Sequence, residues 1–213
     1  MRLVLASASP ARRSVLRSAG IEPVVVVSGV DEDAVTAGLT DPTPEDTVAA
    51  LAAAKAEAVV EHLDDLDGVV VGCDSMLFMA DGELVGKPHT VEVARARWAA
   101  MAGGTGDLLT GHAVLRCSGG VVTARSAGVC TTTVRFGKPS DRELEAYLAT
   151  GEPLAVAGAF TLDGLGAWFV EGVDGDPSSV IGISLPLTRR LLADIGVDIA
   201  DLWQEGETAL DSR

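Results

Sequence analysis

The chain has 213 residues, 47% hydrophobic and 22% charged, a balance typical of a folded globular protein that buries its own core. Its net charge of −15, from 31 acidic and 16 basic residues, argues against binding to nucleic acid or an anionic membrane, because both need a basic surface. No apolar run approaches the roughly 18 residues of a membrane span, and the three cysteines lack metal-ligand spacing, so we expect a cytoplasmic protein.

Strands and helices alternate along most of the chain. The patterns predict strands over residues 2–6, 22–28, 68–78 and 83–86, and helices over 10–19, 44–62, 90–102 and about 186–195. Residues 111–136 read as long antiparallel strands turned at Ser118-Gly119-Gly120, and a further helix begins after Ser140. Residues 151–182 are rich in glycine, and we expect the polar residues 204–213 to fray. The mixture of elements predicts an α/β fold with a mixed sheet.

The first helix begins with an unusual charge pattern. Ser9 can cap the free amides, and Pro10 suits the first helical position. Arg12 and Arg13 then add positive charge where the helix dipole is already positive, and where an acid would be favoured by about 0.3–1 kcal/mol. An anion resolves this conflict, because amides, serine hydroxyls and guanidinium groups at a helix start form a phosphate site. The alternative is that both arginines face solvent.

An acidic cluster follows the second predicted strand. Asp31, Glu32 and Asp33 lie together in what we expect to be a loop. Loop carboxylates in such a place can bind Mg²⁺. The alternative is an ordinary solvated loop, since acidic loops are common in a chain this acidic.

The helix over 44–62 begins in the ordinary way, with Thr43 as its cap and acidic residues in its first turn. Lysine is scarce in this chain, so the position of each lysine is informative. Lys55 lies seven residues after Val48 and therefore falls within the apolar stripe of the helix. Spacing alone favours a lysine that snorkels out at the helix edge; the alternative is that Lys55 points into a site.

The strand over 68–78 is apolar except for Asp74 and Ser75. With a period of two, Asp74 shares a face with Gly72, which we expect to leave open space beside it. Carboxylates are almost never fully buried without a partner. Asp74 therefore needs a cation, a metal or water.

The next turn offers such a cation. Asp81-Gly82 is a strong signal for a two-residue hairpin turn. That turn pairs residue 76 with Lys87 and places the lysine diagonal to Asp74 on one face, about 7–8 Å away. A slip of one residue would move Lys87 to the other face. The alternative is an exposed hairpin lysine.

Several familiar signatures are absent from the sequence. The glycine-rich phosphate loop, the dinucleotide-binding fingerprint and the serine-hydrolase elbow are missing, and the three histidines are scattered. Taken together, the stretches that are present resemble the Maf family of nucleoside triphosphate pyrophosphatases, nearly end to end. The resemblance is carried by LASASPARR, VDED, LAAAKA, GCDS, LVGKP, LTGHAVL and the long segment GEPLAVAGAFTLDGLGAWFVEGVDGDPSSVIGISLPL.

The resemblance implies a mixed, curved central sheet with flanking helices, and two lobes around a cleft, as a single domain over 1–203. It implies hydrolysis of a nucleoside triphosphate between its α and β phosphates, with Mg²⁺ or Mn²⁺. Asp74 falls at the general base, with metal ligation by the same residue as an open alternative. Phosphate-binding positions fall on Ser7, Arg12, Lys55 and Lys87, to which the charge pattern adds Ser9 and Arg13; Glu32, with Asp31 beside it, falls near the metal.

The sequence also departs from the family pattern. Ala11 replaces the first arginine of the opening motif, Val156 replaces a lysine, and Asp163 replaces a glutamine. An aspartate accepts two hydrogen bonds and would suit guanine, or the amine of cytosine. The branch thought to act on 7-methylated guanosine triphosphate also has an acid at this position, but it has a tryptophan where this chain has Ala11. Resemblance to that branch is therefore partial.

Two functions are compatible with these features. The first is the metal-dependent pyrophosphatase, and the second is a nucleotide-binding regulator of cell division with little turnover. A structural protein without a ligand would leave the charges at the first helix unexplained. The preferred base, the metal and the oligomeric state are not determined at this level, and a homodimer is left open.

Overall fold

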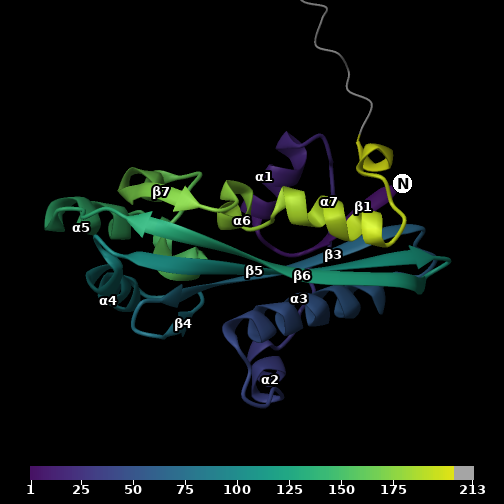
Figure 1. Ribbon diagram of the computed structural model, residues 1–213, viewed down its shortest axis with the longest axis horizontal. Helices are drawn as coiled ribbons and strands as arrows, with labels where there is room; N and C mark the ends of the chain where they lie inside the picture. The colour runs from purple at the N-terminus through teal and green to yellow at the C-terminus, as the bar shows by residue number, and fades with distance from the viewer. Residues whose placement is uncertain (204–213) are drawn as a thin grey trace, which may run out of the picture.

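A mixed sheet of seven strands forms the centre of the computed structural model, which describes residues 1–203 (Figure 1). The predicted tail over 204–213 lies outside the described residues. The strands follow the order β2-β1-β3-β5-β6-β7, with β4 paired to β3, so the α/β prediction is confirmed. They are β1 (Arg2–Ala6), β2 (Val24–Val25), β3 (Gly68–Met79), β4 (Leu84–Val85), β5 (Thr105–Ser118), β6 (Val121–Phe136) and β7 (Val170–Asp174).

Helices cover both faces of this sheet. In Figure 1, α1, α6 and α7 lie on one side of the long strands, and α2 and α3 lie on the other. Within residues 1–203, none of the helices combines the length and the apolar character that a membrane crossing requires. The helices are α1 (Pro10–Ser18), α2 (Glu32–Ala37), α3 (Pro44–Val60), α4 (Val91–Met101), α5 (Asp141–Ala149), α6 (Pro177–Ile181) and α7 (Leu185–Asp194), with short 3₁₀ turns η1 (Glu152–Ala155), η2 (Ala157–Ala159), η3 (Leu165–Phe169) and η4 (Ile199–Leu202).

The predicted helix starts are confirmed. The side chains of Ser9, Thr43 and Ser140 cap α1, α3 and α5. The turn between β5 and β6 is also as predicted, with Gly119 and Gly120 at φ values of 56° and 74°, in the region that favours glycine.

Other predictions were wrong in extent. The strand expected over 22–28 is reduced to the two exposed residues of β2. The acidic stretch is not a loop, because Asp31 accepts a hydrogen bond from the Ala34 amide and so begins helix α2. The glycine-rich region contains an unpredicted strand, β7, which pairs with β6.

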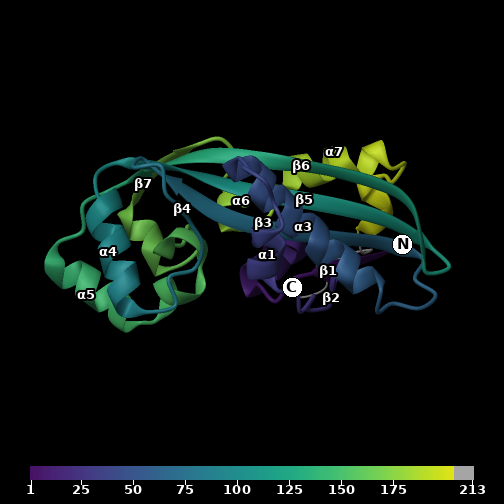
Figure 2. The same ribbon diagram turned by 90° about the horizontal axis from the view of Figure 1, so that it is seen from below.

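Three apolar clusters hold these layers together. Beneath α1 and α7, one cluster includes Leu16, Val71 and Leu192, and on the opposite face α3 buries Ala52 and Ala56 against Val70. The third cluster surrounds Trp98 at the far end of the long strands, next to α4 and α5. Seen from below (Figure 2), α4 and α5 lie at one end of these strands, and α1, α3 and α7 lie farther along them. The division into two lobes within residues 1–203 stays a prediction.

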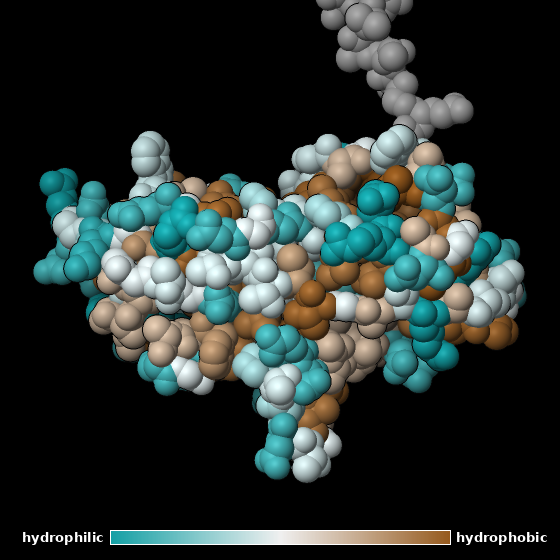
Figure 3. Space-filling model, in the orientation of Figure 1, coloured by the Kyte–Doolittle hydropathy of each residue, from teal (hydrophilic) through white to brown (hydrophobic). Residues whose placement is uncertain are grey.

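Helix α2 contributes little to the core. None of its residues is buried. In Figure 3 the lower edge of the molecule carries a projection with several hydrophilic residues, at the place where Figure 1 labels α2. This helix therefore adds exposed surface rather than core.

One edge of β3 is interrupted. Strand β1 pairs with residues 68–72 of β3, and β4 pairs with Leu77 and Phe78, whereas β5 runs along the whole opposite edge. Residues 73–76 therefore have a neighbouring strand on one edge only. Asp74 and Ser75 lie in this interruption, directly beyond the end of β1.

The hairpin between β3 and β4 differs from the prediction by one residue. The Met79 amide donates to the Glu83 carbonyl at 2.8 Å, so the turn contains three residues rather than two. Leu77 pairs with Val85, and extending this register sets residue 76 opposite Gly86. The predicted pairing of residue 76 with Lys87 is therefore wrong, and so is the shared face with Asp74 that it implied.

Glycine on the α3 face of the sheet also acts differently from the prediction. A Cβ atom on Gly72 would lie 2.2 Å from the Ala52 carbonyl oxygen, and one on Gly111 would lie 2.1 Å from that of Val48. Gly72 does not leave open space, because the backbone of α3 fills it. These two glycines let α3 approach the sheet closely, and that approach sets the position of Lys55.

We therefore predict that Gly72→Ala destabilises the fold by about 1–3 kcal/mol, because the added methyl group forces α3 outward. Gly38→Ala is the matched control, since Gly38 has φ −77° and a new Cβ would keep 3.4 Å from the nearest atom. We expect the control to change stability by less than about 0.5 kcal/mol. Urea unfolding of both variants measures the difference, and equal midpoints would contradict the close-approach argument.

Candidate active site

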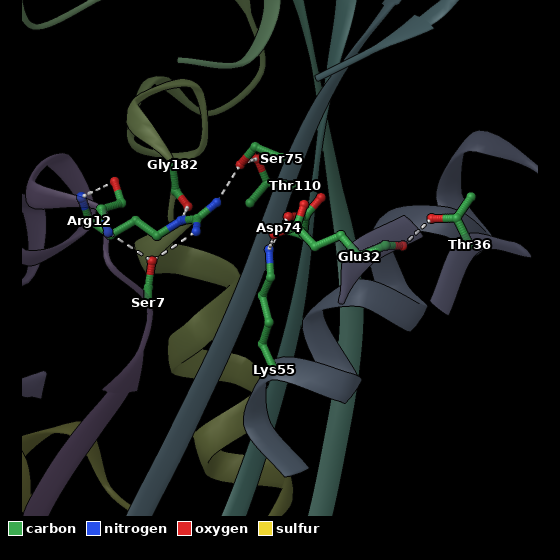
Figure 4. Close-up of polar contacts among 10 residues, drawn as sticks. Ser7, Arg12, Glu32, Thr36, Lys55, Asp74, Ser75, Thr110 and Gly182 are labelled. Atoms are coloured by element: carbon green, nitrogen blue, oxygen red, sulfur yellow. Dashed lines mark hydrogen bonds and ion pairs between the residues drawn. The ribbon is translucent and has the colours of Figure 1, made fainter. Parts of the chain in front are cut away.

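A buried lysine and two carboxylates meet at the interrupted edge of β3 (Figure 4). The Lys55 ammonium, from α3, lies 2.5 Å from Asp74 Oδ1 and 2.7 Å from Glu32 Oε1. Lys55 and Asp74 are only 8% and 7% exposed, so Lys55 points inward and does not snorkel. Glu32 reaches them from the first turn of α2 and stays half exposed. Asp74 thus has the cationic partner that its burial required.

Burial sets the protonation behaviour of Asp74. Loss of hydration raises the pKa of the Asp74 carboxyl above its ordinary value, and this outweighs the nearby Lys55 and Arg12, which lower it. The Glu32 carboxylate adds to the rise. A carboxylate with a raised pKa is a better proton acceptor than an ordinary aspartate. Asp74 therefore suits the role of a general base.

Arg12 lies on the other side of the same strand. Its Nε donates to the Gly182 carbonyl at 2.7 Å, and its terminal nitrogens donate to Ser7 Oγ and Ser75 Oγ, each at 3.0 Å (Figure 4). Arg12 thus points inward from α1, and solvent exposure does not explain it. Because successive side chains of a strand point to opposite faces, Asp74 faces Lys55 and Ser75 faces Arg12. Two cationic groups therefore flank β3 where its edge is open.

The two predicted serines have different places in this arrangement. The Ser9 hydroxyl caps α1 by accepting from the Arg12 amide at 3.4 Å. Ser7 follows β1 directly, and its hydroxyl oxygen accepts from the Ser9 amide at 3.2 Å as well as from the Arg12 side chain. Ser7 thus belongs to the Arg12 network, and Ser9 shapes the start of the helix that carries Arg12.

Arg13 is not brought to the cluster. It pairs with Glu22 at 2.6 Å, and its side chain is 48% exposed. Arg17 pairs with the same glutamate at 2.7 Å. For Arg13, the solvent-facing alternative describes the structure better than phosphate binding does.

Three further predicted residues lie outside the contacts that join Lys55, Asp74 and Arg12. Asp31 Oδ1 is used to cap α2. Lys87 is exposed, although Gly86 beside it is held by Arg97, whose terminal nitrogen donates to the Gly86 carbonyl at 2.6 Å. Asp163 is exposed, in the segment between η2 and η3.

The loop that carries Asp163 has a fixed anchor. Glu152 accepts from the Thr161 hydroxyl at 2.5 Å and from the Leu165 and Gly166 amides at 3.1 Å each. Burial raises the pKa of Glu152, but these hydrogen bonds together outweigh it and lower the pKa. An ionised carboxylate therefore ties both ends of the loop, with Asp163 between them.

Sequence reasoning missed the groups that hold Arg12. Ser75 was visible as the only polar neighbour of Asp74 in an apolar strand, but no role followed from that. Gly182 was hidden in a glycine-rich region, and only its φ of 134° and the 3.1 Å from a hypothetical Cβ to Arg12 Cγ reveal its purpose. Thr110 and His112, on β5, lie in LTGHAVL, one of the stretches that carry the family resemblance, but no role was assigned to them.

The carboxylates of Glu32 and Asp74 could supply part of the coordination of a divalent cation. Among the described residues, no group of three or more histidine, cysteine or acidic side chains is close enough to hold a metal. Glu32 and Asp74 nevertheless converge on one ammonium group. Magnesium is commonly held by one or two carboxylates together with substrate phosphates. The donor set thus fits an ion that binds with the substrate, but not a complete protein cage.

The Lys55–Asp74 contact leads to a prediction about stability. Lys55→Met removes a cation that lowers the pKa of Asp74, so this pKa rises further above its value in the unfolded chain. A group with a raised folded-state pKa loses stability as the pH rises through that pKa. We expect a loss of about 3–5 kcal/mol at neutral pH, and a smaller loss in mild acid. Urea unfolding at both pH values tests this against Lys138→Met, an exposed lysine; a loss independent of pH would contradict it.

Comparison with known proteins agrees with this geometry. The sequence pattern of the family described as Maf-like protein matches residues 2–195. A nucleoside triphosphate pyrophosphatase of Saccharopolyspora erythraea is 67% identical over 205 residues, covering 95% of this chain and 97% of the relative. Proteins of the same name from Nocardia farcinica and Rhodococcus jostii are 65% and 64% identical, with 95% and 94% of this chain covered and 96% and 95% of theirs. The chain therefore belongs to the Maf family.

Proposed function

We propose that this protein is a nucleoside triphosphate pyrophosphatase, which cleaves the bond between the α and β phosphates to give a nucleoside monophosphate and pyrophosphate. The observation that carries the proposal is the placement of Lys55 and Arg12 on either side of the buried Asp74, at the open edge of β3. Relatives at 64–67% identity bear the name of this activity.

The two cations have hydrogen-bonding capacity left for a polyphosphate. A guanidinium carries five N–H donors, and the contacts of Arg12 among the described residues use three of them. An ammonium carries three donors, of which Lys55 gives two to Asp74 and Glu32. The remaining donors would bind phosphate oxygens, and they stabilise most strongly the charge that develops in the transition state.

Asp74 would act as the base. A water molecule attacks the α phosphorus, a bond from its oxygen to phosphorus forms, and the bridging bond to the β phosphate breaks. The proton of the water passes to the Asp74 carboxylate, whose raised pKa favours this transfer. Pyrophosphate leaves with the electron pair of the broken bond.

A divalent cation, Mg²⁺ or Mn²⁺, is part of the proposal. Glu32 and Asp74 would hold it, and when bound it supplies positive charge that neutralises the triphosphate. Lys55, which touches both carboxylates, keeps their oxygens together before the substrate arrives.

We further propose that Asp163 contributes to the choice of base. Its carboxylate would accept hydrogen bonds from guanine or from the amine of cytosine. The anchoring of its loop by Glu152 supports this role, because an ordered loop can place an acceptor reproducibly.

Asp74→Asn is expected to lower kcat by about 100- to 10,000-fold, because an amide cannot accept the proton. The variant should fold, since the amide oxygen still accepts from Lys55 and the ammonium keeps its ion pair with Glu32. Pyrophosphate release over a panel of nucleotides with Mg²⁺ or Mn²⁺, together with melting temperature, measures both effects. Full activity in the variant would exclude Asp74 as the base, and tight nucleotide binding without pyrophosphate release in the wild type would favour a regulator.

Asp163→Gln is expected to change selectivity with little effect on folding. An amide offers one acceptor and one donor where the carboxylate offers two acceptors, so preference for guanine or cytosine nucleotides should fall relative to dTTP and UTP. Ratios of kcat/KM for GTP, 7-methyl-GTP, CTP, dTTP and UTP measure the change. Asp141→Gln, at an exposed residue of α5, is the control, and identical ratios in wild type and Asp163→Gln would refute the assignment.

A further inference from the structure

We propose that His112 is a positioning residue, which holds the Arg12 guanidinium in place without touching the substrate. This inference rests on the proposed function, because Arg12 is one of its phosphate-binding groups. His112 lies on β5 and is fully buried, and no step described above uses it.

The hydrogen bonds of the imidazole determine its tautomer. The Ser184 amide donates to His112 Nε2 at 2.8 Å, so Nε2 carries a lone pair and no hydrogen. Nδ1 therefore carries the hydrogen and donates to the Thr110 carbonyl at 3.0 Å. Burial lowers the pKa of His112 to about 4, so the ring is neutral at physiological pH. With both nitrogens bound to backbone groups, His112 is neither a base nor a ligand.

The ring connects the two parts of the protein that hold Arg12. On one side, Ser184 lies two residues after Gly182, whose carbonyl accepts from Arg12 Nε. On the other side lies Thr110, whose hydroxyl is 3.0 Å from Ser75 Oγ, the acceptor of a terminal nitrogen of Arg12. His112 thus ties the turn between α6 and α7, which presents the Gly182 carbonyl to Arg12, to strand β5.

The direction of the hydrogen bonds supports one arrangement of this frame. Thr110 Oγ1 donates to the Ser179 carbonyl at 3.1 Å, so its oxygen accepts the hydrogen of the Ser75 hydroxyl. The Ser75 oxygen is then free to accept from Arg12. The hydrogen bonds therefore run in one direction: Arg12 donates to Ser75, Ser75 to Thr110, and Thr110 to the Ser179 carbonyl in α6.

Packing at the turn makes Arg12 sensitive to its position. Gly182 has φ 134°, and a Cβ there would lie 3.1 Å from Arg12 Cγ and 3.3 Å from Nε. The turn is thus in close contact with the arginine side chain. If the Ser184 amide lost its acceptor on His112, the turn could shift and Arg12 would lose its alignment.

A pair of amide variants separates the two bonds of the ring. His112→Gln places an oxygen near the position of Nε2 and can still accept from Ser184, whereas the shorter His112→Asn can donate to Thr110 but does not reach Ser184. We expect His112→Asn to lower kcat/KM for pyrophosphate release by about 10- to 100-fold, with His112→Gln much closer to wild type. Melting temperatures identify an assay temperature at which both variants are folded.

A double-mutant cycle with Arg12→Met shows whether the effect passes through Arg12. If it does, His112→Asn has little further effect once Arg12 is gone; a merely structural role would give losses that add. Equal activity of His112→Asn and wild type, or additive losses, would overturn the inference. Should His112→Asn not fold, Ser184→Pro completes the cycle with the same two outcomes, because it removes the amide that donates to His112 at a φ of −74° that proline can adopt.

Failure of the proposed function is a separate result. A wild type that releases no pyrophosphate from any nucleotide overturns the pyrophosphatase proposal. The same cycle is then measured as the dissociation constant of an α,β-methylene nucleoside triphosphate with Mg²⁺. Non-additive losses of affinity support the role of His112, and additive losses or no binding by the wild type overturn it.

Discussion

The buried ion pair between Lys55 and Asp74 is the interaction on which the arrangement of the site depends. Neither charge would be stable in this environment alone, because an isolated buried ion costs several kcal/mol. The pair forms because α3 packs directly on the glycines of β3 and β5, and this brings the ammonium to 2.5 Å from the carboxylate. The close packing of α3 on the sheet therefore also determines where the charged groups of the site lie.

The pairing pattern of β3 explains how side chains from two helices reach this part of the strand. A fully paired central strand would shield Asp74 and Ser75 on both edges. Here β1 ends at Ala6, and β4 begins its pairing at Leu77, so the strand between them is covered by β5 alone. Alternation of side chains then assigns Asp74 to the α3 face and Ser75 to the α1 face. Neighbouring residues of this strand, Asp74 and Ser75, therefore contact cationic side chains on opposite faces of the sheet.

In the proposed function, chemistry and base selection fall to different parts of the chain. Lys55, Asp74 and Arg12 come from α3, β3 and α1, and their contacts are short and partly or fully buried. Asp163 is exposed on a loop that Glu152 anchors near η3. On this proposal, substitutions in the loop would change which base is bound without disturbing the Lys55–Asp74 ion pair.

The sequence by itself determined what depends on local rules. Ser9, Thr43 and Ser140 mark helix starts because a hydroxyl caps free amides, and Asp74 stands out because a carboxylate in an apolar strand needs a partner. Charge placement also singled out Arg12, Lys55 and the acidic cluster, and the family resemblance then implied roles for them. Tertiary structure decided the rest. A turn of three residues in place of two removed the predicted pairing of residue 76 with Lys87. An ion pair with Glu22 holds Arg13 at the surface, and packing of α3 points Lys55 inward although its spacing favoured the helix edge. His112 and Gly182 lie in stretches that carry the family resemblance, but their contacts could not be read from the sequence. These contacts join segments about 70 and 170 residues apart, and only the folded chain brings those segments together.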